Sequence, residues 1–557
     1  MFAGVCRIVA ALAFVTVTFA AVAQTIPPSE QPGRERERFT PPTPPRAQPG
    51  GAAISLPSTV APAGAENIKI VVRDIRIVGS TVYSADELAA LTRELIGRKV
   101  SVADIYSLAR RITEKYGNDG YVLSRAIVPP QRFNPRGAVV RIDVVEGWIN
   151  KIEWPAKLSR YRDFFSDYTT KITSMRPANI RTIERYILLA SDLPGLKFAT
   201  SLRPSPGVRD ASTLVVEVTE KPIDANVRVD NRGTQARGPV QFLASSTLNN
   251  LLGLHEALTL SWAATTQLRE LEYFAGSYRQ VLNSEGLTLV ANGSYGYGRP
   301  GTSQLEILQY KTKSTYVDVG LSYPVVRLRE RNLALTGLFF SSDSQSDILN
   351  AAFNLDKLRG MRLRADGDFA DRFGGIHQIN VAYSQGVKGL GSSDNGNPLA
   401  SRAAGRVDFG KIEADVSRLQ PLFATVSALL AVRGQYATTS LLSPEQCGYG
   451  GGRFGRAFDP SQLLGDHCWM ALGELRYDVP GAPSVLTQAQ VYFFADYGKV
   501  YTIAPAAFTA ASAEGASAGA GLRLAWQAWL AADLSAAKAI EGPRDDWRFF
   551  FTVVARY

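Results

Sequence analysis

The sequence contains little histidine and carries none of the common catalytic motifs. Its three histidines, His255, His377 and His467, lie in separate segments without a second ligand at the spacing of a zinc site. No P-loop, no Gly-x-Ser-x-Gly elbow and no obvious Ser, His and Asp set occurs. We therefore expect no metal site, no cofactor and no enzymatic activity.

Long apolar runs are missing beyond the first residues. Arg7 and an apolar stretch at residues 8–22, ending in Ala21-Val22-Ala23, are typical of a secretory signal peptide with its cleavage site. We expect residues 1–23 to be removed. No later stretch offers the 18 or more apolar residues that a spanning helix needs, although 45% of the chain is hydrophobic. If the chain spans a membrane, we expect it to span as a β-barrel.

Cysteine is also scarce. Loss of Cys6 with the signal peptide leaves only Cys447 and Cys468. An even pair in an oxidising compartment favours a disulfide, and two unpaired thiols are the alternative.

The formal charge is +10, but lysine and arginine are scattered and form no patch with interleaved aromatic residues. This pattern argues against a nucleic-acid partner. A basic surface or lumen near anionic lipid headgroups is the simpler interpretation.

Composition divides the chain into a linker, two similar modules and a long β-rich region. Residues 24–65 are rich in proline and charge, so we expect a tether that buries no core, with one short helix at residues 35–39. Residues 66–147 and residues 148–222 each follow the order strand, helix, helix, strand, strand.

In the first module, the predicted strands lie at residues 70–78, 122–128 and 138–145. Capping boxes at Ser84 and Ser101 open its two helices. In the second module, we expect helices near residues 161–174 and 179–191 and strands near 196–203 and 213–219.

The pattern of apolar and polar residues changes at residue 223. From there to residue 557, alternating segments of roughly ten residues are separated by Gly, Asn, Asp and Pro, as in an outer-membrane barrel. At roughly twenty residues per strand and connection, this length predicts about sixteen strands. The predicted fold class is therefore two small α+β domains followed by a transmembrane antiparallel β-barrel.

Several motifs give the chain a family resemblance over residues 66–557. Asn118-Asp119-Gly120-Tyr121 and Val144-Val145-Glu146-Gly147 resemble a polypeptide-transport-associated (POTRA) domain. The most specific stretches are Phe454-Gly455-Arg456-Ala457-Phe458, Glu474-Leu475-Arg476-Tyr477 and Phe494-Ala495-Asp496-Tyr497-Gly498. Together they resemble the outer-membrane transporters of two-partner secretion (TpsB proteins) in the Omp85 superfamily.

The resemblance implies a lumen loop near residues 440–470, anchored to the barrel wall. Arg456 and Asp496 are the candidate anchor pair, because a guanidinium binds a carboxylate by a bidentate, charge-assisted bond. Gly455 and Gly498 would permit close backbone approach, and Phe454 and Phe458 would wedge the tip against the wall.

Three positions depart from the family pattern. Ala457 stands where the family usually has Gly, which predicts a slightly different loop tip. Cys447 and Cys468 replace an expected aromatic residue and an expected Gly on either side of the loop. A disulfide between them would close a loop of about twenty residues and stabilise it by roughly 3 kcal/mol.

The resemblance also implies a function. The chain would reside in the bacterial outer membrane as a monomer in contact with lipid, with its POTRA domains in the periplasm. It would recognise and secrete one TpsA-like exoprotein of the haemolysin or adhesin type. An assembly factor that inserts other barrels is the alternative, and a diffusion porin would need neither module.

A partner segment could add to a module's sheet edge. The candidate capture surface lies around Ile105, Leu108, Ile112, Val122 and Ile127. The alternative is that these apolar residues form the module's core.

Overall fold

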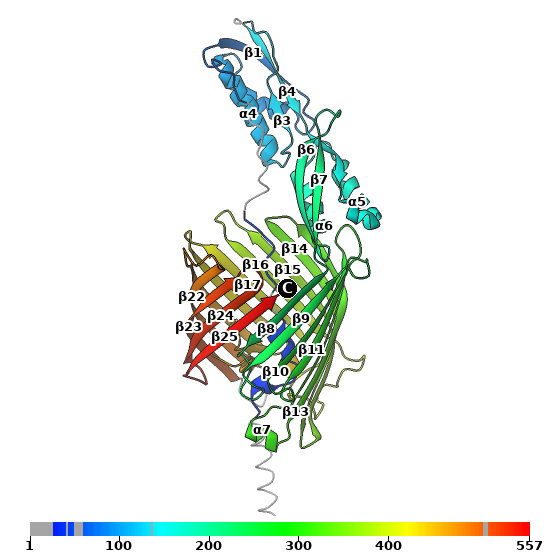
Figure 1. Cartoon of the computed structure of the whole chain (residues 1–557), viewed down its shortest axis with the longest axis vertical. Helices are drawn as coiled ribbons and strands as arrows, with labels where there is room; N and C mark the ends of the chain where they lie inside the picture. Colours follow the sequence, from blue (N-terminus) through cyan, green and yellow to red (C-terminus); the bar gives the residue numbers. More distant parts are fainter. Residues whose placement is uncertain (1–25, 41–42, 50–59, 135–136, 505–510) are drawn as a thin grey trace, which may run out of the picture.

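The computed structural model describes residues 26–40, 43–49, 60–134, 137–504 and 511–557. These residues form a short segment inside a barrel, two small α+β modules and the barrel itself (Figure 1). The predicted signal peptide, residues 1–23, lies outside the described residues. None of the helices in these ranges is long and apolar enough to cross a membrane.

The first module packs two helices on a four-stranded sheet. Its strands are β1 (Lys69–Val78), β2 (Lys99–Ser101), β3 (Arg125–Ile127) and β4 (Ala138–Val145), in the order β2-β1-β4-β3. Helix α3 (Ala85–Thr92) and helix α4 (Val102–Asn118) both begin with the predicted capping boxes, Ser84 with Glu87 and Ser101 with Asp104. Strand β3 is shorter than predicted because a turn, in which Ser124 N–H donates to the Tyr121 carbonyl at 2.9 Å, precedes it.

Glu146 ties the end of this module to the segment that follows β1. Its carboxylate accepts hydrogen bonds from the backbone N–H groups of Thr81 (2.8 Å) and Val82 (3.2 Å) and from the Tyr116 hydroxyl (2.7 Å). Burial acts to raise the pKa of Glu146, but these hydrogen bonds outweigh burial, so that this pKa lies below its ordinary value.

The second module repeats the plan with three strands. They are β5 (Trp148–Glu153), β6 (Leu196–Pro204) and β7 (Ala211–Glu220), in the order β5-β7-β6. A 3-10 turn, η2 (Ala156–Tyr161), and helices α5 (Arg162–Thr173) and α6 (Ile180–Ser191) pack on this sheet. The module stands on one rim of the barrel, where Arg327 binds Asp192 through two nitrogens at 2.6 and 2.8 Å.

Sixteen antiparallel strands close the barrel, as the segment length predicted. They are β8 (Ile223–Asp230), β9 (Gln241–Asn249), β10 (Glu256–Thr265), β11 (Glu272–Val281), β12 (Thr288–Gly298), β13 (Lys311–Arg327), β14 (Arg331–Ile348), β15 (Ala351–Ala370), β16 (Ile376–Gly386), β17 (Gly410–Pro421), β18 (Val426–Ala437), β21 (His467–Asp478), β22 (Leu486–Thr502), β23 (Ala511–Trp526), β24 (Leu530–Glu541) and β25 (Trp547–Arg556). Strand β25 pairs with β8 to complete the ring.

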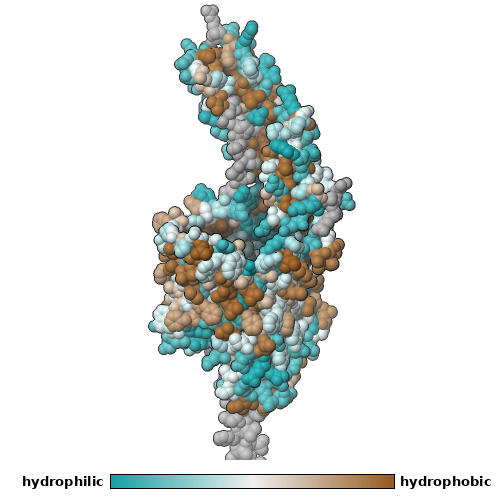
Figure 2. Space-filling model, viewed as in Figure 1, coloured by the Kyte–Doolittle hydropathy of each residue, from teal (hydrophilic) through white to brown (hydrophobic). Residues whose placement is uncertain are grey.

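Side chains along each strand alternate between lipid and lumen. On β13, Val317 and Val319 are exposed, whereas Tyr316 and Asp318, which alternate with them, are buried. Hydrophobic residues therefore cover much of the barrel's outer surface (Figure 2). A short helix, α7 (Ser303–Ile307), lies in the loop that follows β12.

Residues 26–40, here called the lumen plug, lie inside the barrel (Figure 1). They contain a 3-10 turn, η1 (Pro28–Glu30), and the predicted short helix, α2 (Glu35–Phe39). The expectation that this segment buries no core was wrong for this part of it, because Phe39 is buried against Tyr273, with ring centroids 5.2 Å apart. Beyond the plug, the Gln48 N–H donates to the Arg329 carbonyl at the rim that carries the second module.

Candidate functional site inside the barrel

The loop between β18 and β21, residues 438–466, folds back into the barrel and is here called the lumen loop. It contains a 3-10 turn, η3 (Ser443–Glu445), and two short paired strands, β19 (Cys447–Tyr449) and β20 (Leu463–Gly465). At its tip Phe454 and Phe458 are buried, and the Phe458 ring lies 5.4 Å from that of Tyr449. The tip therefore wedges aromatic side chains against the inner wall, where the sequence predicted them.

Asp496 on β22 binds the backbone of this tip. Its carboxylate accepts hydrogen bonds from the N–H groups of Gly455 (2.8 Å) and Arg456 (3.4 Å). The hydroxyls of Tyr449 (2.7 Å) and Ser517 (2.8 Å) donate to the same carboxylate. Four donors thus satisfy a buried anion, and two of them fix the turn at the loop tip.

The expected side-chain pair between Arg456 and Asp496 is therefore wrong. The Arg456 guanidinium instead binds Glu474 on β21 at 2.7 Å. Both oxygens of Asp496 already accept other donors, whereas Glu474, whose side chain is fully buried, needs cations. Arg476 and Arg523 also bind Glu474, at 2.7 and 2.8 Å, so one carboxylate joins the loop tip to two wall strands.

Two glycines let the loop approach the wall. A Cβ at Gly498 would lie 2.2 Å from the Tyr449 ring, and Gly455 has a φ of +71°. Ala457 is not among the described residues with positive φ. The alanine at this position therefore brings no left-handed strain to the tip.

A disulfide joins Cys447 and Cys468, with Cα atoms 6.2 Å apart. Cys447 begins β19 of the lumen loop, and Cys468 lies on wall strand β21. The bond therefore fastens the base of the loop to the wall, while Asp496 and Glu474 hold its tip. Of the two alternatives open from the sequence, the structure has the bonded pair.

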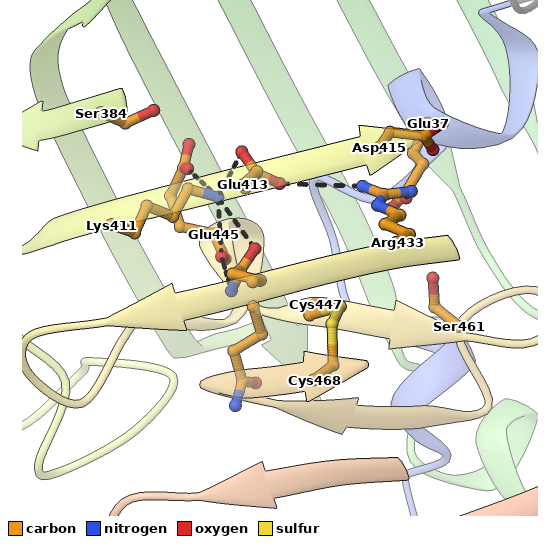
Figure 3. A network of polar contacts seen from close by, with 12 residues as sticks. Glu37, Ser384, Lys411, Glu413, Asp415, Arg433, Glu445, Cys447, Ser461 and Cys468 are labelled. Atoms are coloured by element: carbon orange, nitrogen blue, oxygen red, sulfur yellow. Dashed lines mark hydrogen bonds and ion pairs between the residues drawn. A yellow bond between two sulfur atoms is a disulfide. The ribbon is translucent and has the colours of Figure 1, made fainter. Parts of the chain in front are cut away.

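The lumen plug contacts both the loop and the wall, and Figure 3 shows the contact with the wall, where Glu37 lies beside Arg433. Arg34 donates to the Gln446 carbonyl (2.5 Å) and to the Ser461 hydroxyl (3.0 Å), both in the lumen loop. Glu37 pairs with Arg433 of β18 at 2.8 Å. The plug is thus held partly by the loop that the wall anchors.

A second contact holds the end of the plug that lies farther from the two modules. Glu30, fully buried, pairs with Arg237 at 2.7 Å, and Arg237 also lies 3.4 Å from Glu35. Arg237 belongs to the loop between β8 and β9, opposite the two modules. Ion pairs at both ends therefore keep the plug along the lumen.

Glu445 of the lumen loop belongs to a further cluster of charged side chains. It is buried and binds Lys411 at 2.8 Å and Arg362 at 3.1 Å (Figure 3). Removing Glu445 would leave two lumen cations with less compensation. The cluster therefore gives the loop a third attachment, to β15 and β17.

The candidate capture residues of the first module divide into two groups. Ile105, Leu108 and Ile112 have 0% exposure and belong to the core, so they cannot contact a partner without unfolding. Val122 and Ile127 are partly exposed. The core alternative is correct for the helix residues, and a capture role for Val122 and Ile127 remains a prediction.

Sequence reasoning missed several residues that hold the site. Glu474 lies within a motif recognised from the sequence. Its role as a carboxylate for three arginines depends on the position of the loop tip inside the barrel, which the sequence does not give. Glu30 and Arg237 carried no signal, because each is an isolated charge in a polar segment, and Arg34 begins a run of alternating charges at residues 34–38 that could equally be solvated. Within the described residues, no group of three or more His, Cys, Asp or Glu side chains is arranged to hold a metal ion.

The fold and the site together define a class of protein. A closed barrel with an anchored lumen loop and two small modules at one rim is a protein-translocating barrel of the outer membrane. Residues 210–524 match the haemolysin secretion/activation protein family ShlB/FhaC/HecB, and residues 70–147 match the ShlB-type POTRA domain. The chain belongs to this family, the outer-membrane transporters of two-partner secretion. The barrel accordingly lies in the outer membrane and the modules in the periplasm.

Individual relatives match most of this chain, and a solved structure shares its fold. The outer membrane transporter CdiB of Dickeya dadantii (strain 3937) is 25% identical over 478 residues, covering 82% of this chain and 80% of CdiB. The heme/hemopexin transporter protein HuxB of Haemophilus influenzae (strain 86-028NP) is 21% identical over 419 residues, covering 75% and 73%. The solved structure of CdiB from Escherichia coli shares the fold, with a TM-score of 0.69 at 18% identity over 89% of this chain and 92% of CdiB.

Proposed function

We propose that this transporter captures one unfolded exoprotein of the haemolysin or adhesin class in the periplasm and passes it through its own barrel. The second module offers an edge for an extended partner segment, because β6 is the outer strand of its sheet and most of its residues are exposed. With no ATP in that compartment, folding of the partner outside the cell supplies direction.

The occupied lumen is the observation that carries this proposal. The lumen plug and the lumen loop both lie inside the barrel and bind each other through Arg34. A porin for small solutes needs no such segment. A partner chain, in contrast, can enter only when the plug leaves, so we propose that the described structure is the closed, resting state.

Two measurements test the proposal. Deletion of the gene is expected to remove one large protein from the culture supernatant, and the intact gene is expected to restore it. Deletion of residues 28–39 is expected to raise single-channel conductance in planar bilayers. Glu66→Gln, an exposed carboxylate ahead of β1, is the matched control and should leave both measurements unchanged.

Other outcomes contradict the proposal. An unchanged supernatant would exclude secretion of a partner. A general loss of other barrels from the outer membrane would instead identify an assembly factor. Conductance that stays at its resting value without residues 28–39 would show that this segment does not close the pore.

A further inference from the structure

An apolar depression lies on the lipid-facing side of strands β8 to β13. Its volume is about 860 Å³. The strand register places one row of its residues side by side across six strands: Ala225, Ser246, Leu260, Gly276, Gly293 and Val317. Strands β8 to β11 of this face are at the front of Figure 1, and hydrophobic residues cover the same part of the barrel in Figure 2.

Small residues make the floor of this depression. A Cβ built at Gly276 would meet nothing closer than a Leu260 methyl at 3.8 Å, and a Cβ at Gly293 nothing closer than the Tyr316 carbonyl at 3.9 Å. Neither glycine has a positive φ. Packing and backbone conformation therefore do not require glycine at these positions, and a larger side chain there would fill the depression.

Bulky side chains form the extracellular wall of the depression. Trp262, Phe274 and Tyr295 stand side by side in the next row of the register. Phe274 and Tyr295 are 47% and 39% exposed. Because the lining is almost entirely apolar and faces the bilayer, a hydrocarbon chain is the ligand that matches it.

Cations follow directly above these aromatic residues. Lys313 is exposed, its Nζ lies 5.8 Å from the Tyr295 ring centroid, and it pairs in register with Tyr297. Arg299, exposed and 5.6 Å from the Tyr297 ring centroid, and Lys311, the first residue of β13, lie beyond it, toward the extracellular end. Three acidic residues lie near this end: Glu272, in the row of Lys313, Asp347, which pairs in register with Lys311, and Glu306, which pairs with Arg269 at 3.1 Å.

We infer that this surface is a binding site for a phosphate-bearing lipid of the extracellular leaflet. One acyl chain lies on Gly276 and Gly293, beneath the three aromatic side chains. The phosphate lies at Lys313, with Arg299 adding positive potential, whereas Asp347 opposite Lys311 offsets the charge of that lysine. Toward the extracellular end, the apolar floor is followed by the aromatic row and then by the cations. This order matches that of acyl chain, interface and headgroup in one leaflet.

Quenching of tryptophan by brominated lipid measures this binding. The intact protein is reconstituted in phosphatidylcholine vesicles that contain increasing fractions of brominated phosphatidic acid or of brominated phosphatidylcholine. The chain has seven tryptophans, so the signal of Trp262 is taken as the difference between wild type and Trp262→Phe. We expect phosphatidic acid to quench Trp262 at a mole fraction about fivefold lower than phosphatidylcholine does.

The other side of the barrel offers a matched control. Trp469 is 45% exposed on β21 and pairs in register with Lys499, whose Nζ lies 5.8 Å from the Tyr501 ring centroid. Lys499, however, binds Glu514 at 3.0 Å. We therefore expect Trp469 to be quenched equally by the two lipids, because this lysine is neutralised.

Two variants separate the headgroup from the acyl chain. Lys313→Gln is expected to abolish the preference for phosphatidic acid at Trp262. Gly293→Leu, which fills the depression, is expected to weaken quenching of Trp262 by both lipids. Equal quenching of Trp262 by the two lipids in the wild type, or a preference that survives both variants, would overturn the inference. Absence of any quenching would overturn it in favour of a protein occupant such as a second copy.

Discussion

Replacing Arg456 by alanine is expected to destabilise the barrel through Glu474 and to leave the hydrogen bonds of Asp496 in place. Glu474 is a fully buried carboxylate, and Arg456 is 8% exposed and 2.7 Å from it. Removing one partner of such a pair costs about 3–5 kcal/mol, and because Arg476 and Arg523 remain we expect the lower end of that range. Alanine keeps the N–H that Asp496 binds.

A double-mutant cycle measures which carboxylate Arg456 uses. The free energy of unfolding is obtained from urea titrations of the purified barrel in detergent micelles, followed by tryptophan fluorescence. We expect Arg456→Ala and Glu474→Gln to be coupled by about 1–3 kcal/mol, and Arg456→Ala and Asp496→Asn to be additive within about 0.5 kcal/mol.

The neighbouring Arg453 supplies the control for this cycle. It belongs to the same tip but is 41% exposed and pairs with Asp415 at 2.7 Å. Its replacement by alanine should cost no more than about 1 kcal/mol. A stronger coupling of Arg456 to Asp496 than to Glu474 would refute the assignment, as would equal costs for Arg453→Ala and Arg456→Ala.

Three further predictions concern the loop base, the plug and the first module. The double variant Cys447→Ser/Cys468→Ser should lose about 3 kcal/mol of barrel stability, since the bond closes 21 residues, and reduced wild type should match it in the same urea titration. Arg433→Ala, which frees Glu37 of the plug, should raise the frequency of channel openings in planar bilayers, and openings as rare as in wild type would contradict a retaining role. Because hydrogen bonds lower the pKa of Glu146, its contribution to stability is present above roughly pH 4.3 and is lost as pH falls through its lower folded pKa. Glu146→Gln should therefore flatten the pH dependence of thermal unfolding between neutral and acidic pH, and an unchanged profile would contradict this.

Local features of the fold were readable because they depend on neighbours in sequence. The capping boxes at Ser84 and Ser101 need only residues three positions apart, and both occur as predicted. The strand number followed from a repeat length that the bilayer thickness imposes. The first residue of the strand predicted at residues 122–128 was harder to predict, because the turn before Arg125 competes with strand pairing.

Contacts across the lumen were harder to predict. Asp496 was identified as a receiver of the loop, yet two of its four donors are backbone N–H groups, which look the same in every sequence. The plug was predicted to bury nothing, because its composition cannot form an apolar core. Besides the burial of Phe39, ion pairs hold it in the lumen, Glu30 with Arg237 and Glu37 with Arg433, and such pairs become visible only once the strands are placed.

The position of the lumen plug also constrains the order in which the molecule is built. The plug lies inside a ring that β25 and β8 close, over the register from Thr552 with Asp230 to Arg556 with Asn226. A segment that runs through a ring cannot be added sideways after the ring is complete. Either the chain closes its last strand pair around a segment already threaded, or the free amino-terminal end slides in along the axis afterwards. Maturation of this barrel therefore requires threading of the plug as well as folding. The two routes differ in whether β25 pairs with β8 before or after the plug enters.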